Sequence, residues 1–261
     1  MDPALADRLN EINRSFYGRF AAAFAESRSL EQSGLHRLRD HIPVGSRVLD
    51  VGCGPGRFAL LLERWSESFP VHGAGPESAQ PVNATTYTYL GLDSSSQLIE
   101  LAIQRTAHLE RVAADLLVAD LLAPAWRDAV SGRKFDVILL LAVLHHVPGF
   151  DNRLALMRAL AEHLDHGGKL VVSVWQFADH PRMRRKIVSW DNVGVQPAGL
   201  EPGDYLLDWK RGGTGYRYCH QVDMAELNRL AGAAGLELLE TFRADGKEGN
   251  LSLYGVMNAA T

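Results

Sequence analysis

The stretch RVLDVGCGPGRFALLLERW, residues 47–65, joins three local patterns in one continuous run. A short β-branched segment ends in a glycine-rich turn and leads directly into residues with helical spacing, which predicts a strand, a turn and a helix. Glycines at such a turn let a ligand lie against bare main chain, and the following helix N-terminus offers unpaired N–H groups. This unit alone is equally typical of NAD or FAD binding.

The same strand-then-helix pattern repeats along the chain. YTYLGLD, residues 87–93, predicts a second strand, and Ser94 or Ser95 then serves as N-cap of a helix. Further predicted elements are strands at 112–119, 135–141 and 170–175 and a helix at 153–164. We therefore expect an α/β fold: a Rossmann-like, doubly wound, seven-stranded, mainly parallel sheet with an antiparallel terminal strand and a helical cap.

Segments outside this repeat suggest how one domain, residues 1–261, is organised. Helical periodicity dominates the N-terminus, and Pro, Gly, Ser and Asn break every period in the loop insertion. A helix capped by Asp223 and two strands joined by a Gly-containing turn close the chain. The predicted parts are an N-terminal helical cap (1–45), a cofactor-binding core (46–175) with the loop insertion (66–86), a helical substrate-side cap (176–222) and a C-terminal helix and hairpin (223–261).

Composition excludes several classes of protein. The longest apolar run, residues 137–144, is far shorter than the ~20 residues of a membrane-spanning helix. The N-terminus lacks the features of a secretory signal, so we expect a cytoplasmic protein. Two cysteines provide no disulfide framework, and no CxxC or His/Cys cluster predicts a metal. A formal charge of −4 argues against a general nucleic-acid-coating protein but allows a local basic patch.

Acidic residues indicate which ligand the glycine turn serves. Asp50 precedes the turn, Asp93 ends the next predicted strand and Asp120 follows the third. In a parallel sheet these carboxylates meet at the C-terminal edge, where such folds bind ligands. A carboxylate at the end of the second strand suits a ribose diol. Asp93 lies 39 residues beyond Gly54, against about 20 in a dinucleotide-binding fold, and the insertion accounts for the excess.

These motifs, from residue 47 to residue 175, resemble the class I S-adenosylmethionine-dependent methyltransferases. The resemblance implies that the turn cradles the methionine portion, that Asp93 holds the ribose hydroxyls, and that Asp120 with Leu121 reaches the adenine. Cys53, within the turn, is interpreted as a small apolar filler with no catalytic task. The cofactor-binding residues predicted in this way are Asp50, Gly52, Cys53, Gly54, Gly56, Asp93, Ser94, Asp120, Leu121 and Leu141. The alternatives are plain turn residues with solvated strand ends, or a dinucleotide site.

A closer similarity lies in FYGRFAAAFAESRS (16–29), LAVLHHVPG (141–149), GDYLLDWK (203–210) and RYCH (217–220). Together these segments look like the tRNA methyltransferases that esterify a carboxymethyl group on wobble uridine. The resemblance implies catalytic roles for His145, His146 and Arg217, and substrate contacts for Arg28, Tyr218 and His220. Two departures are Cys219, where a second aromatic residue is usual, and the loss of an aromatic pair around residues 249–251.

The chemistry of methyl transfer leaves the roles of these residues open. A neutral hydroxyl or amine acceptor needs a base, whereas a carboxylate is already ionised and needs positioning, so the histidines serve either as base or as clamp. The Arg217 guanidinium can pair with a carboxylate or a phosphate in a fork. The basic run from His180 to Lys186 is either an RNA-backbone contact or a solvated helix face.

We therefore expect a methyltransferase that uses S-adenosylmethionine and acts on a carboxylate of a modified tRNA wobble uridine. One alternative is an O- or N-methyltransferase of a small metabolite, which suits the acidic net charge. Another is a catalytically silent module that binds the cofactor and regulates a partner protein. A small helper protein is a further possible partner, while no membrane and no metal are expected.

Overall fold

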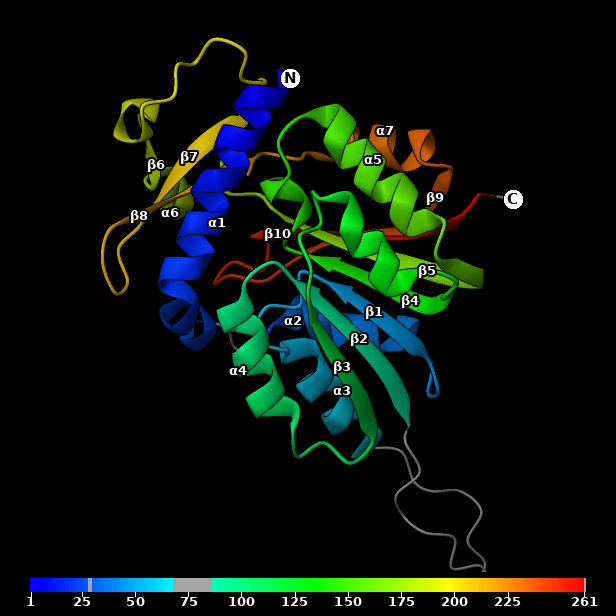
Figure 1. Cartoon of the computed structure of the whole chain (residues 1–261). Helices are drawn as coiled ribbons and strands as arrows, with labels where there is room; N and C mark the ends of the chain where they lie inside the picture. Colours follow the sequence, from blue (N-terminus) through cyan, green and yellow to red (C-terminus); the bar gives the residue numbers. More distant parts are fainter. Residues whose placement is uncertain (28–29, 68–85, 261) are drawn as a thin grey trace, which may run out of the picture.

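A computed structural model describes residues 1–27, 30–67 and 86–260. Its main element is a seven-stranded sheet with the order β3-β2-β1-β4-β5-β10-β9 (Figure 1). β10 runs antiparallel to both of its neighbours, and the other strands are parallel to one another. The strands are β1 (Arg47–Val51), β2 (Tyr87–Asp93), β3 (Val112–Val118), β4 (Phe135–Leu141), β5 (Leu164–Trp175), β9 (Leu236–Ala244) and β10 (Ser252–Ala259). The predicted fold class is confirmed.

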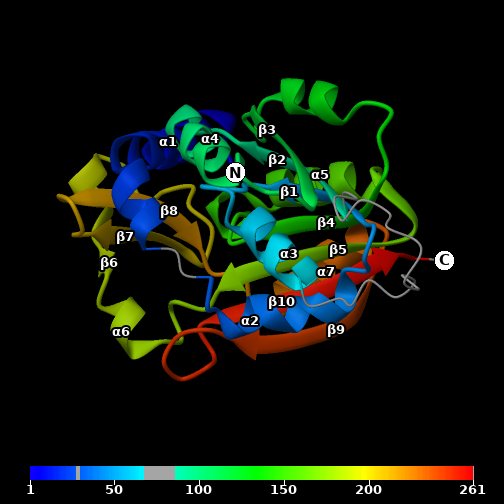
Figure 2. The same ribbon diagram turned by 90° about the horizontal axis from the view of Figure 1, so that it is seen from below.

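Helices cover both faces of this sheet, as Figures 1 and 2 show. One apolar core lies between the sheet and the helices α5, α7 and the 3-10 helix η2, and a second lies beneath α2, α3 and α4. Ser95 caps α4 and Asp223 caps α7, each accepting a backbone N–H. The helices are α2 (Ser33–Arg37), α3 (Arg57–Glu67), α4 (Ser96–Thr106), η2 (Pro124–Val130), α5 (Phe150–Ala161) and α7 (Met224–Ala233).

Two element boundaries differ from the sequence prediction. The helix predicted at 153–164 is α5, which begins three residues earlier and ends at Ala161. β5 begins at Leu164 rather than at Leu170, because Leu164 already pairs with Phe135 of β4. Residues 165–169, between the predicted helix and the predicted strand, belong to this irregular strand start, where the register shifts. Of the predicted insertion, Ser66 and Glu67 belong to α3, and residues 68–85 lie outside the described part of the chain.

The order of the strands fixes where a ligand can bind. The chain passes from β1 to β2 on one side and returns to β4 on the other, so the direction of strand progression reverses at β1. In open α/β sheets the crevice at such a reversal, outside the carboxyl ends of the strands, is the usual ligand site. The glycine-rich turn follows β1 directly and therefore lies at this position.

The N-terminal helix α1 (Pro3–Glu26) and a second, three-stranded sheet stand over the same edge (Figure 1). This small sheet is antiparallel, with the order β6-β7-β8. It replaces most of the helical structure predicted at 176–222, because β7 and β8 pair through a glycine-containing hairpin that packs on α1. Its strands are β6 (Ile187–Val188), β7 (Asp204–Trp209) and β8 (Gly215–His220), preceded by the short helix α6 (Pro181–Arg184).

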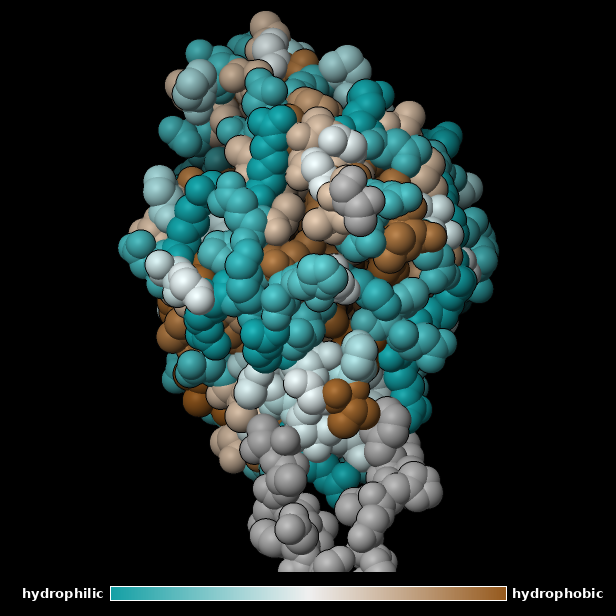
Figure 3. All heavy atoms as spheres, turned by 90° about the vertical axis from the view of Figure 1, so that its right-hand side faces the viewer, coloured by the Kyte–Doolittle hydropathy of each residue, from teal (hydrophilic) through white to brown (hydrophobic). Residues whose placement is uncertain are grey.

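The surface of the molecule carries no extended apolar face in the view of Figure 3, where hydrophilic side chains predominate and apolar ones form small separate groups. Within the described residues, every helix is too short or too polar to cross a lipid bilayer. The exposed large apolar side chains are scattered through the sequence, which is common on protein surfaces.

Candidate active site

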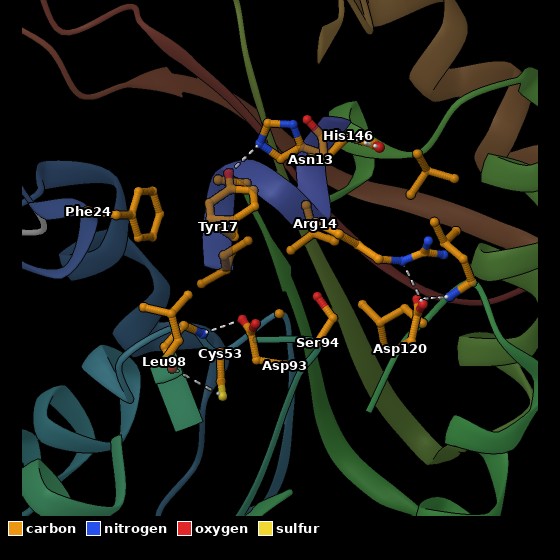
Figure 4. A pocket seen from close by; sticks show the side chains of 18 of the residues that line it. Asn13, Arg14, Tyr17, Phe24, Cys53, Asp93, Ser94, Leu98, Asp120 and His146 are labelled. Atoms are coloured by element: carbon orange, nitrogen blue, oxygen red, sulfur yellow. Dashed lines mark hydrogen bonds and ion pairs between the residues drawn. The ribbon is translucent and has the colours of Figure 1, made fainter. Parts of the chain in front are cut away.

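A cavity opens at the carboxyl ends of β1, β2, β3 and β4, beneath α1 (Figure 4). Many of the residues predicted to bind the cofactor line this cavity together with one predicted catalytic residue. They are Gly52, Cys53, Gly54, Asp93, Ser94, Asp120, Leu121, Leu141 and His146. The tertiary structure thus brings together side chains from four separate strand ends.

The glycine turn forms part of the cavity wall with bare main chain. Gly54 has a φ of +55°, and a Cβ added there would have only the Phe24 ring within reach, at 4.0 Å. Gly52 has a φ of +78°, and its Cβ would lie 2.2 Å from Cγ2 of Val143. Gly56 does not line the cavity; it allows α3 to approach Ala102 of α4. The turn is therefore both left-handed and closely packed, which only glycine tolerates.

Asp93 is oriented by the turn. Its Oδ2 accepts the Gly54 N–H at 2.9 Å, and its Oδ1 accepts the Ser95 N–H at 2.9 Å. Burial raises the pKa of this carboxyl, while the backbone hydrogen bonds oppose the rise. Figure 4 shows the side chain at the cavity wall beside Ser94. A pair of neighbouring hydroxyl groups, as in a ribose, fits this acceptor.

Asp50 lies behind the turn rather than in the cavity wall, which revises the direct contact expected from the sequence. It is buried, and its Oδ2 accepts the Tyr89 hydroxyl at 2.6 Å. Burial raises its pKa to about 6, and the Tyr89 hydrogen bond and the charge of Arg57 oppose this rise. The reason is its place inside β1, where it pairs with both neighbouring strands. Asp50 supports the turn from below.

Asp120 lies at the opposite side of the cavity from the glycine turn. Its Oδ1 accepts the Leu122 N–H at 3.0 Å, and its Oδ2 lies 3.2 Å from Nε of Arg14. Arg14 belongs to α1, and Figure 4 shows its side chain extending across the cavity to reach Asp120. This ion pair connects the helix α1 to the end of β3.

His146 and Tyr17 form a second polar pair in the wall. His146 Nδ1 lies 2.9 Å from the Tyr218 carbonyl oxygen, and Nε2 lies 2.9 Å from the Tyr17 hydroxyl. Since a carbonyl oxygen only accepts, Nδ1 carries a proton, and in the neutral ring Nε2 accepts from Tyr17. Asn13 holds the backbone of β8 in place by bonding to both the N–H and the carbonyl of Tyr218. The His146 ring thus has one assigned tautomer when neutral.

Arg217 lies one layer behind this wall, contrary to the prediction that it lines the pocket. Its side chain is 2% exposed, and its guanidinium carbon lies 4.8 to 5.2 Å from the ring centroids of Phe16, Trp175 and Trp209. Among the described residues its Nε and Nη1 have no hydrogen-bond acceptor. A buried cation without an acceptor is costly even with aromatic contacts. This is a strong indication of a site built for an anion.

His145 joins Arg217 to the cavity wall through aromatic contacts. It is fully buried, its ring lies 4.8 Å from Trp175 and 4.3 Å from His146, and it does not line the cavity. His146 also contacts Trp175, at 5.9 Å. The predicted catalytic residues are therefore neighbours, but only His146 lines the cavity.

Tyr218 and His220, predicted to contact substrate, lie in a buried polar cluster away from the cavity. The Tyr218 hydroxyl donates to Asp204 at 2.7 Å. His220 lies between two carboxylates, with Nδ1 2.7 Å from Asp204 and Nε2 2.9 Å from Glu226. Burial lowers the pKa of His220, but these two hydrogen bonds outweigh that effect and raise it overall. Neither residue lines the cavity, and their side-chain polar atoms are already paired within the protein.

The same cluster joins the small sheet to the main domain. Arg153 of α5 is 1% exposed and pairs with Glu226 of α7 at 2.8 Å and with Glu201 at 2.7 Å. Glu201 immediately precedes β7, so the ion pairs connect the two parts of the molecule. The remaining predicted substrate residue, Arg28, lies outside the described residues.

Two groups of side chains within the described residues are close enough to consider as metal ligands: His145, His146 and Cys219, and Glu201, Asp204 and His220. Their chemistry does not favour this role. Burial raises the pKa of Cys219 to about 12, whereas a metal-binding cysteine must lose its proton. Both ring nitrogens of His220 already face carboxylates.

The sequence interpretation missed the contribution of α1. Its residues line the cavity at helical spacing, so they form one face of the helix: Asn10, Asn13, Arg14, Tyr17 and Phe24. The only available signal was the segment at 16–29, which carried the family resemblance and contains Tyr17. Periodicity alone identified the apolar face of α1, which packs on the small sheet and on α4.

Comparisons with known proteins identify the family and the fold. A family model described as a methyltransferase domain matches residues 23–241. The CcbJ methyltransferase from Streptomyces caelestis has the same fold, with a TM-score of 0.64 and 18% identity, over 94% of this chain and 98% of that one.

Curated relatives include proteins with different acceptors. A tRNA (carboxymethyluridine(34)-5-O)-methyltransferase of Schizosaccharomyces pombe is 24% identical, over 88% of this chain and 91% of the relative. A probable tRNA methyltransferase 9B of Mus musculus is 27% identical over 74% of this chain, which spans only 36% of that relative. A ubiquinone biosynthesis O-methyltransferase of Brucella anthropi is 29% identical, over 75% of this chain and 62% of the relative.

Proposed function

The chain belongs to the methyltransferase domain family, and we propose that it transfers a methyl group from S-adenosylmethionine to a carboxylate of its acceptor. The acceptor that we favour is a carboxymethyl group on the wobble uridine of a tRNA. The observation that carries the proposal is the buried Arg217 guanidinium, which has hydrogen-bond donors without acceptors next to the cavity.

The residues of the cavity fit the cofactor. The bare main chain at Gly54 leaves room for the methionine portion, and Asp93 presents two oriented oxygens to the ribose. Asp120 and Leu121 lie where the adenine would be held, at the end of β3. When bound, S-adenosylmethionine supplies a methyl group on a positively charged sulfur, which an oxygen nucleophile attacks in line.

The acceptor side fits a carboxylate better than a neutral group. A carboxylate needs no base, so the protein has mainly to hold it and to exclude water. Nε and Nη1 of Arg217 are buried donors without an acceptor among the described residues, and a guanidinium forms strong charge-assisted hydrogen bonds with a carboxylate. In this proposal His146 and Tyr17, which line the cavity, position the acceptor oxygen, and His146 keeps its Nδ1 proton on the Tyr218 carbonyl.

A tRNA acceptor is supported by the names of the relatives in fission yeast and mouse. A small carboxylic acid is the second candidate. It is favoured by the depth of Arg217, which is 2% exposed behind aromatic rings and therefore accessible only to a compact group. We favour an enzyme over a silent cofactor-binding module, because His146 lines the cavity with its ring orientation fixed by the Tyr218 carbonyl.

The decisive experiment offers both acceptors to the purified protein. It is incubated with methyl-labelled donor and either total tRNA from the source cell or a small-molecule extract, with and without added cell protein to supply a helper. Nucleosides are then analysed by mass spectrometry. A new methyl ester in tRNA that mild alkali removes supports the proposal, whereas label confined to the extract overturns the tRNA acceptor. Alkali-stable methylation in either fraction overturns the carboxylate.

A further inference from the structure

Six cations lie in two segments of the small sheet and its flanking helix α6. Three are exposed arginines in and after α6, and a half-buried lysine precedes β6. Two more are exposed at the hairpin between β7 and β8. We call this group the basic surface: Arg182, Arg184, Arg185, Lys186, Lys210 and Arg211. Figure 2 shows α6 next to β6. β6 pairs with β7, and the Asp208 N–H donates to the Lys186 carbonyl at 2.8 Å, which places the two segments on one part of the molecule.

The two segments share one electrostatic field although they are separate in sequence. Burial lowers the pKa of Lys186, and the nearby positive charges of Arg217, Arg182 and Arg211 lower it further. Asp208 opposes these effects only in part, and it also lies 3.4 Å from Lys210. The basic surface is therefore continuous with the charge of Arg217.

Few acidic groups neutralise this surface. Within the described residues Arg182, Arg184, Arg185 and Arg211 form no ion pair. The chain as a whole carries a formal charge of −4, so the positive field is local and not a property of the whole protein. Single exposed cations without an ion pair are common on protein surfaces. Here unpaired cations from two segments that are distant in sequence lie close together, and solvent exposure alone does not explain this clustering.

The packing of the hairpin holds the cations in position. A Cβ added to Gly213 would lie 3.3 Å from the Phe20 ring of α1, and one added to Gly212 would lie 3.3 Å from Ala23. The hairpin therefore rests against the helix that covers the cavity. Lys210 and Arg211 are presented beside the acceptor side of the site, at the end of the strand that precedes Arg217.

We propose that the basic surface binds the phosphates of an RNA strand whose modified base delivers its carboxylate to Arg217. This inference rests on the proposed tRNA acceptor. Most of the cations are arginines, which bind phosphate oxygens through paired N–H groups. A small carboxylic acid would need Arg217 alone, whereas a polyanion with regularly spaced charges matches several cations on two segments.

The test measures tRNA binding separately from methyl transfer. Binding of fluorescent total tRNA to the protein with S-adenosylhomocysteine is followed by anisotropy over a range of salt concentrations. The variant Arg182→Gln/Arg185→Gln/Arg211→Gln removes three charges. If each contacts one phosphate, the slope of log affinity against log salt should fall by about 2 to 3. S-adenosylhomocysteine affinity should stay within about twofold, because none of these residues lines the cavity.

A matched control removes three exposed arginines around the main sheet: Arg127→Gln/Arg133→Gln/Arg229→Gln. For this control, the slope of log tRNA affinity against log salt concentration should equal that of the unchanged protein. Equal slopes for both triple variants, with tRNA still bound and methylated, overturn the basic surface but leave the tRNA acceptor intact. If the unchanged protein neither binds nor methylates tRNA, the proposed acceptor itself fails. Competition by polyglutamate but not by oligouridylate also overturns the inference, in favour of an acidic protein partner.

Discussion

The cofactor side and the acceptor side of the cavity are built in different ways. At the cofactor side the main chain dominates: Gly54 provides bare backbone, and Asp93 is anchored by two backbone N–H groups. At the acceptor side the wall consists of side chains, from α1 and from His146, and Arg217 lies one layer behind it with donors that have no acceptor within the described part of the chain.

This difference has an energetic consequence. Backbone-anchored groups at the cofactor side are satisfied within the fold, so ligand binding adds contacts to a stable arrangement. The buried guanidinium at the acceptor side lowers the stability of the free protein until an anion pairs with it. Substitutions at the cofactor side should therefore change cofactor affinity, whereas substitutions at the acceptor side should change acceptor turnover and the stability of the free protein.

The largest effect is expected from Asp93→Ala. It removes the proposed ribose acceptor and leaves the Gly54 N–H without its partner, so affinity for S-adenosylhomocysteine should fall by about 100-fold or more. Titration calorimetry measures this affinity. Asp93→Asn, which keeps the shape but loses the charge, should have an intermediate effect. Unchanged affinity in Asp93→Ala would show that the cavity does not hold the cofactor in this way.

Arg217→Met tests the acceptor side and should separate activity from stability. We expect kcat/KM for the acceptor to fall about 100-fold, since a charge-assisted fork is lost, with S-adenosylhomocysteine affinity unchanged. The free energy of unfolding should stay equal or rise, because a buried unpaired charge is replaced by an apolar chain. Urea denaturation checks this. Lower stability together with weaker cofactor binding would mean that Arg217 is structural.

Tyr17→Phe should have a smaller effect, because one hydroxyl is lost and the ring packing stays. The substitution removes the donor to His146 Nε2, and a single hydrogen bond corresponds to a decrease in kcat of about 3- to 10-fold. Steady-state kinetics measures it, and His146→Asn is the comparison. If kcat of the Tyr17→Phe/His146→Asn double variant is no lower than that of His146→Asn alone, the two side chains act as a pair. If the two decreases in kcat multiply, the pairing is contradicted.

The smallest effect is a pH dependence of stability at the polar cluster behind the site. The pKa of His220 is raised in the folded protein, so its stabilisation is complete below its unfolded pKa, near 6.5, and is lost as pH rises through the folded value. The pKa of Glu226 shifts in the opposite direction. Burial raises it, but the hydrogen bond of His220 and the charge of Arg153 outweigh burial and lower it overall. Its stabilisation is present above about 4.5 and is lost as pH falls through its lower folded pKa.

Urea denaturation between pH 5 and 9 tests this prediction. The unchanged protein should lose stability as pH rises above about 6.5, and His220→Asn should lack that decline. Both proteins should bind S-adenosylhomocysteine alike at pH 7, because His220 does not line the cavity. The same decline in both would assign the pH dependence to other groups.

The core strands and the carboxylates at their ends were predictable from local patterns. β2 and β4 have the predicted bounds, and Asp93 and Asp120 line the cavity as expected. Asp93 ends β2 and Asp120 closely follows β3, so locating each strand in the sequence also located its carboxylate. The small sheet was not predicted, since the pairing of β7 with β8 depends on packing against α1. Arg14 and Tyr17 were missed because helical periodicity identifies the apolar face of α1 but not the side chains that meet the cavity.

By itself, the sequence determined the order of the β–α units and the glycine turn, because hydrophobic periodicity and left-handed backbone are local properties. The tertiary structure decided which side chains meet. It placed Asp50 and His145 behind the cavity wall, paired Tyr218 and His220 with buried carboxylates, and enclosed Arg217 among rings from three elements. Burial and hydrogen-bond satisfaction depend on contacts between different secondary-structure elements, and no local pattern records these contacts.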